Sequence, residues 1–118
     1  MDAEGCSEEV LVEKSRLEFL RETVETRPDD AFARYGLAIE LVKSGQHAEA
    51  WRHFEYLLTR HADYSPAYYQ AGMFLVSQAR REEAKKVLAK GVEVTRRQGN
   101  SHALSELQAF LDELGDET

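Results

Sequence analysis

The feature that most constrains the fold is an internal repeat. Residues 31–64 align with residues 65–98 without a gap, which defines a 34-residue period. A fixed period of this length is typical of chains built from stacked copies of one supersecondary unit. Six positions are identical between the two copies, namely Ala33 and Ala67, Tyr35 and Tyr69, Leu41 and Leu75, Val42 and Val76, Glu49 and Glu83, and Ala50 and Ala84.

Apolar residues recur at helical spacing along nearly the whole chain, which predicts an all-α protein. Turn residues divide this pattern into about six helices, expected near residues 7–26, 31–44, 47–60, 66–78, 81–97 and 101–114. Asp29 and Asp30 are expected to cap the helix at 31–44 and Ser65 the helix at 66–78, and Gly45 and Gly115 are expected to end helices. Residue sizes also agree between the copies where two helices would cross: Ala38 matches Gly72, Ala50 matches Ala84, and Phe54 matches Leu88.

The two copies resemble the tetratricopeptide repeat family, whose pattern is W-x2-L-G-x2-Y, then A-x3-F and a closing proline, with the same period. The L-G pair is filled by Leu37-Ala38 and Ala71-Gly72, and the A-x3-F element by Ala50 with Phe54 and Ala84 with Leu88. Tyr68 stands in the tryptophan position, whereas Arg34 departs from it. Ala62 and Arg96 replace the closing proline, but Pro28 lies one full period before Ala62.

The resemblance implies a right-handed stack of helices with a concave face. Pro28 indicates that residues 7–28 form an N-terminal half repeat, followed by full repeats at 31–64 and 65–98. Residues 101–114 are expected to form a capping helix, because Glu106 stands where a small crossing residue would be needed. A length of 118 residues fits one domain, expected at 7–118, preceded by a disordered acidic tail at residues 1–6.

A second apolar stripe suggests a binding surface. It runs along the helix expected at 31–44 and recurs one period later as Pro66, Tyr69, Met73 and Val76. We interpret it as a groove for a peptide or amphipathic helix of another protein, formed by Phe32, Tyr35, Ile39, Val42, Tyr69, Met73 and Val76. Two alternatives remain, since the terminal helices could cover the stripe as ordinary core, or a second copy could cover it in a homodimer. Gly36 lies beside the stripe, and a glycine inside a helix needs a reason. Either another backbone approaches closely there, or the position tolerates substitution and the glycine arose by random drift.

The resemblance does not extend to every binding mode of the family. Some members clamp a partner's C-terminal carboxylate with lysines and asparagines in the groove. Here Tyr35, Ile39, Tyr69 and Met73 occupy it instead. A clamp of that kind is therefore not expected.

Charge narrows the range of partners. The formal net charge of −7 opposes non-specific attraction to nucleic acid or anionic membranes. Residues 65–98 depart from this average, with seven bases and three acids. This basic stretch is read as a solvated face or as a docking surface for an acidic ligand or RNA, with Arg80, Arg81, Lys85, Lys86 and Lys90 as the candidates. Its lack of interleaved aromatic residues argues against nucleic acid.

The sequence contains no recognisable catalytic or metal-binding arrangement. His47, His53 and His61 are six and eight residues apart, so no neighbouring pair shares one helical turn. Cys6 lies among acidic residues, which disfavour its thiolate. We therefore predict no enzyme, no metal and no cofactor. A single cysteine and no run of about 18 apolar residues predict a cytoplasmic location without a membrane span.

Overall fold

The computed structural model describes residues 16–116, and every regular element in that range is a helix. The chain divides into two compact units, Met1–His53 and Phe54–Thr118, and the boundary lies inside a continuous helix. Each unit is described by itself. The predicted tail at residues 1–6 and the start of the first predicted helix lie outside the described residues.

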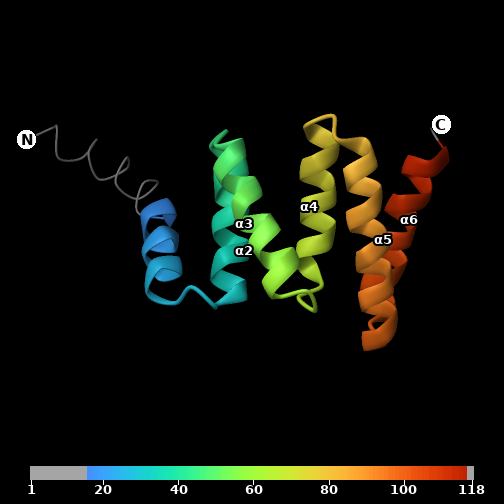
Figure 1. Ribbon diagram of the computed structural model, residues 1–118, viewed down its shortest axis with the longest axis horizontal. Helices are drawn as coiled ribbons and strands as arrows, with labels where there is room; N and C mark the ends of the chain where they lie inside the picture. Colours follow the sequence, from blue (N-terminus) through green and yellow to red (C-terminus); the bar gives the residue numbers. More distant parts are fainter. Residues whose placement is uncertain (1–15, 117–118) are drawn as a thin grey trace, which may run out of the picture. The chain divides into compact units, whose positions relative to one another are not determined.

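In the described part of the N-terminal unit, residues 16–26 are helical, and we call them the N-terminal segment. After a turn at Pro28 comes α2 (Ala31–Lys43), and then the start of α3 (His47–Arg60) (Figure 1). Asp30 caps α2 as predicted, because its carboxylate accepts a hydrogen bond from the backbone N–H of Ala33 at 3.0 Å. Gly45 follows α2 with φ +79°, a conformation that favours glycine.

The C-terminal unit contains the end of α3 and the helices α4 (Pro66–Ser77), α5 (Arg81–Gln98) and α6 (Ser101–Asp116). α4 and α6 both pack against α5, and Figure 1 shows these three helices side by side. Gly99 ends α5 with φ +70°. The second connecting residue, Asn100, then caps α6 by accepting a hydrogen bond from the N–H of Ala103 at 3.2 Å.

One predicted helix cap and one predicted helix end differ from the structure. Ser65 precedes Pro66 at the N-cap position of α4 as predicted, but its dihedral angles are helical and its side chain makes no capping hydrogen bond. The N–H of Tyr68 donates instead to the backbone carbonyl oxygen of Ser65 at 3.2 Å. Gly115 does not end the last helix, which continues to Asp116. Its φ is not positive, so nothing there breaks the helical backbone.

Small residues lie where the sequence predicted helix crossings. Ala38, Ala50 and Ala84 are fully buried and Gly72 is buried as well. In the C-terminal unit, a Cβ placed on Gly72 would lie 2.7 Å from Leu88 Cδ2, which shows how closely α4 approaches α5. The close crossing of α4 and α5 therefore requires a residue without a side chain at Gly72.

Candidate protein-binding face

An apolar groove lies between the N-terminal segment and α2. It encloses a volume of about 560 Å³. Two aromatic rings on its lining are largely in water, with Phe19 67% and Phe32 75% exposed. Large exposed apolar groups of this kind mark surfaces that bind other molecules.

Three of the predicted binding residues line this groove together, namely Phe32, Tyr35 and Ile39. Val42, the fourth residue of that stripe, is half-buried and is not part of the lining. The sequence analysis missed the opposite wall, which is formed by Phe19 and Leu20 of the N-terminal segment. The 34-residue register could have identified Leu20, because it aligns with Phe54 and Leu88.

Gly36 lines the groove. Within this chain, a Cβ added to it would meet only the side chain of Leu20, at 3.5 Å. That is an ordinary van der Waals distance, so the chain itself leaves room there for a methyl group.

A polar network fixes the N-terminal segment to α3. Arg21 Nη1 donates a hydrogen bond to Glu49 Oε2 at 2.6 Å, and Arg21 Nη2 donates to Gln46 Oε1 at 3.1 Å. His53 lies next to this pair, with Nε2 3.9 Å from the same Glu49 oxygen. The groove therefore has a wall that is held by charge-assisted hydrogen bonds as well as by apolar packing.

The surroundings of His53 favour its neutral form. Its Nδ1 lies 3.2 Å from Arg34 Nη1, and because a guanidinium can only donate, Nδ1 must accept. Burial is the largest cause that lowers the pKa of His53, and the positive charge of Arg34 lowers it further. Glu49 acts in the opposite direction but does not outweigh them.

Arg34, which departs from the family pattern, makes the same kind of hydrogen bond as the residue at the equivalent position of the second repeat. Arg34 Nη2 donates to the carbonyl oxygen of Pro28 at 2.7 Å. In the next copy, the Tyr68 hydroxyl donates to the carbonyl oxygen of Ala62 at 2.5 Å. Both bonds run six residues back to the position of the closing proline, so arginine and tyrosine here make the same connection.

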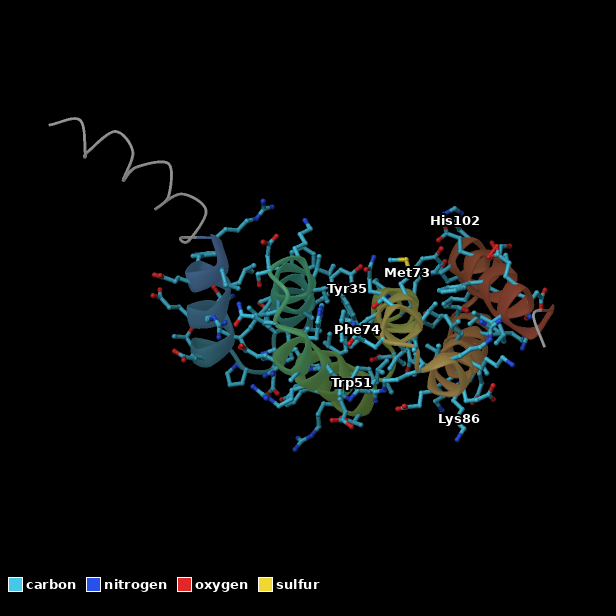
Figure 2. All side chains as sticks on the ribbon, turned by 90° about the horizontal axis from the view of Figure 1, so that it is seen from above. Tyr35, Trp51, Met73, Phe74, Lys86 and His102 are labelled. Atoms are coloured by element: carbon cyan, nitrogen blue, oxygen red, sulfur yellow. The ribbon has the colours of Figure 1, made fainter. Side chains whose placement is uncertain are left out.

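The α4 stripe in the C-terminal unit is partly covered. The ring of Tyr69 packs against Phe110 of α6, with centroids 5.3 Å apart. Met73 and Val76 remain exposed, and Figure 2 shows Met73 on the outer side of α4. Of the α4 stripe, α6 therefore covers Tyr69.

Part of the basic stretch on α5 is paired with the three acids of the same stretch. Arg80 makes two hydrogen bonds to the Glu83 carboxylate, at 2.8 and 2.7 Å, which lower the pKa of Glu83. Arg81 donates to the carbonyl oxygen of Leu114 at 2.7 Å. Further pairs join Lys85 to Glu82 at 3.4 Å, and Lys90 and Arg97 to Glu93 at 3.8 and 3.7 Å. Lys86 extends away from α5 (Figure 2).

Two further surveys concern the described residues alone. Within residues 16–116, no three histidine, cysteine or acidic side chains gather in a way that could hold a metal ion. In the same part of the chain, no helix is long and apolar enough to cross a membrane.

Comparison with known proteins agrees with the repeat pattern. A tetratricopeptide repeat model matches residues 41–109. A solution structure of a tetratricopeptide repeat domain protein from Salinibacter ruber is 36% identical with a TM-score of 0.71, covering 74% of this chain and 88% of that one. A crystal structure of such a protein from the same organism is 34% identical with a TM-score of 0.71, covering 75% and 100%.

A third similar structure is a solution structure of a protein from Bordetella parapertussis. It is 26% identical, has a TM-score of 0.71, and the match covers 86% of this chain and 88% of that one. No curated protein matches the sequence.

Proposed function

Because the chain belongs to the tetratricopeptide repeat family, we propose that it is a non-catalytic adaptor that binds a segment of another protein in its apolar groove. The fold of this family generally mediates protein–protein interaction, and its members are typically not enzymes. The groove between the N-terminal segment and α2 is the proposed binding site. The exposed residues of the α4 stripe, Met73 and Val76, are a second proposed contact.

The observation that carries this proposal is the exposure of Phe19 and Phe32 on the two sides of the groove. Burial of apolar surface contributes about 25 cal/mol per Å², so two largely exposed rings offer substantial affinity to a partner that covers them. The groove has few polar groups besides the ion pairs at its rim. It is therefore suited to an apolar side of a peptide or amphipathic helix.

The proposal is tested with a Phe19→Ser, Phe32→Ser variant in a pull-down from lysate of the source cells. Both side chains are mainly in water, so circular dichroism is expected to show an unchanged fold. We expect the native protein to retain a partner that this variant loses. A Lys86→Ser, Lys90→Ser variant changes α5 instead and should retain the partner. Equal retention by all three proteins would refute the groove as the binding site.

A homodimer that uses the same rings is the second candidate, favoured by the same exposure of Phe19 and Phe32. Sedimentation of the purified protein over a range of concentrations separates the two candidates. A mass that rises with concentration, and returns to the monomer value in the Phe19→Ser, Phe32→Ser variant, would identify self-association. Binding of acidic ligands or RNA by α5 is a weaker proposal, since most of its cations already have carboxylate partners.

We also propose that the adaptor works in the cytoplasm. A single cysteine among 118 residues fits a reducing compartment. Fractionation of source cells followed by detection with an antibody tests this location.

A further inference from the structure

We propose that the groove receives an amphipathic α-helix of a partner protein, which packs on the N-terminal segment in the way that α4 packs on α5. This inference rests on the proposed function, because it specifies the partner of the same groove. It follows from comparing one helix face across the three copies of the 34-residue register.

The N-terminal segment, α3 and α5 occupy equivalent positions in that register. The same face is buried in the two later copies, as Ala50, Phe54 and Leu57 in α3 and as Ala84, Leu88 and Gly91 in α5. The corresponding positions of the N-terminal segment are Arg16, Leu20 and Thr23. Arg16 is exposed, and Leu20 and Thr23 are only half-buried. Among the described residues, this face of the N-terminal segment is therefore not fully covered.

The C-terminal unit shows what covers this face when it is buried. Gly72 of α4 lies over Leu88, and a Cβ added to Gly91 would lie 2.7 Å from the Cβ of Tyr68. A helix on the N-terminal segment would meet Leu20 in place of Leu88, so it needs a small residue at that point. It would also meet Thr23 in place of Gly91. Because threonine has a side chain where glycine has none, the residue corresponding to Tyr68 must be small as well.

Charge adds a second requirement. Arg16 and Arg27 stand at the two ends of the open face and are 72% and 69% exposed. Their partners are Glu40 at 3.6 Å and Asp30 at 3.7 Å, but Glu40 also lies 3.7 Å from Lys43. Three cations therefore share two carboxylates at the rim. This excess positive charge favours a helix with acidic residues near both ends.

Two sources within this protein fit the groove poorly. Residues 1–9 carry four carboxylates and one large apolar side chain, Met1, so this stretch offers little apolar surface to the groove. The helices that carry a small crossing residue, α2 with Ala38 and α4 with Gly72, have that residue buried within the chain. A second copy would have to unfold to provide one. The occupant is therefore a helix of another protein.

The test uses a synthetic peptide with the sequence of residues 64–79 and three substitutions, Ser65→Glu, Tyr68→Ala and Ser77→Glu. These changes add acidic ends and a small residue opposite Thr23. The matched control peptide carries Gly72→Leu in addition. Fluorescence anisotropy with the full chain measures binding of each labelled peptide, and circular dichroism measures the helix gained on binding.

We expect saturable binding with a gain of helix, and affinity lower by about tenfold or more for the Gly72→Leu peptide, because a larger side chain overpacks the crossing. Binding should also weaken in the Arg16→Glu, Arg27→Glu protein and at high salt. No saturable binding, equal binding of the two peptides, or a bound peptide without helix would each overturn the proposal.

The groove and its helical occupant can be refuted separately. If a lysate partner is lost in the Phe19→Ser, Phe32→Ser variant but the helical peptide does not bind, the groove is the binding site and the helical partner is refuted. If the pure protein forms a dimer through Phe19 and Phe32, a second copy occupies the groove and the helix of a partner protein is refuted as well.

Discussion

The contact between α4 and α5 predicts that a single methyl group at Gly91 destabilises the protein. An alanine Cβ there would lie 2.7 Å from Tyr68 Cβ, 2.9 Å from Tyr68 Cγ and 3.1 Å from Leu107 Cδ1. The Tyr68 Cβ is attached directly to the α4 backbone, so no side-chain rotation removes the overlap. The two helices must move apart, or α4 must shift along α5.

The expected cost follows from two opposing contributions. Overpacking of a close-packed core costs about 1–3 kcal/mol, and two short contacts to a rigid group place Gly91→Ala at the upper end. Alanine in place of glycine in a helix interior returns about 1 kcal/mol. The net loss in the free energy of unfolding is therefore about 2 kcal/mol. For a chain of this size it corresponds to a decrease in Tm of roughly 8 °C.

Gly36→Ala is the matched control. It makes the same substitution inside a helix, but its nearest neighbour is Leu20 at 3.5 Å. The gain in helix propensity is then unopposed, and stability should rise by up to about 1 kcal/mol. Urea unfolding followed by circular dichroism measures both variants. The reasoning is refuted if Gly91→Ala is as stable as Gly36→Ala, because the two sites would then not differ in packing.

The remaining predictions concern hydrogen bonds, pH and charge. Tyr68→Phe removes the hydrogen bond to the Ala62 carbonyl oxygen and should lower the free energy of unfolding by about 1 kcal/mol. Arg34→Ala should lower it by about 2 kcal/mol, because a charged donor is lost. Urea unfolding measures both variants, and equal losses would contradict this order. Because burial and then Arg34 lower the pKa of His53 below 6.5, unfolded His53 binds its proton more tightly. The contribution of neutral His53 to the free energy of unfolding is thus complete above pH 6.5 and is lost as the pH falls through the lowered pKa. When Tm is measured from pH 7.5 to 5, it should therefore fall less in His53→Gln than in the native protein. At 0.15 M salt, labelled single-stranded RNA should bind neither the native protein nor Lys86→Glu in a fluorescence titration, and tight binding that weakens steeply with salt would restore α5 as a binding surface.

Local sequence determined the helices because their start and stop signals act over a few residues. Apolar spacing located α3 at its observed bounds, and Asp30 and Gly45 marked the ends of α2. At Ser65 the N-cap position was predicted correctly, but the Tyr68 N–H bonds to the Ser65 carbonyl oxygen and the side chain makes no cap. The predicted end at Gly115 was wrong, since glycine permits a left-handed turn but does not require one.

The 34-residue period also determined the architecture, because equivalent residues in repeated units must meet equivalent neighbours. It identified the small residues at the crossings and three lining residues of the groove, Phe32, Tyr35 and Ile39. Only the tertiary structure decided which side chains face them. Phe19 lies outside the periodic stripe of its own helix, and the pairing of Arg34 with the Pro28 carbonyl depends on how a turn folds back.

Some of the electrostatic features were likewise decided by the fold. Helical spacing alone accounts for the pairing of Arg80 with Glu83, three residues apart, but only the tertiary structure brings Arg81 to the carbonyl oxygen of Leu114 in α6. Sequence by itself determined the family, the helices and the candidate stripe, since these follow from local periodicity. Exposure, the ion pair of Arg21 with Glu49 and the open face of the N-terminal segment depend on distances between residues far apart in the chain, and only the tertiary structure sets those distances.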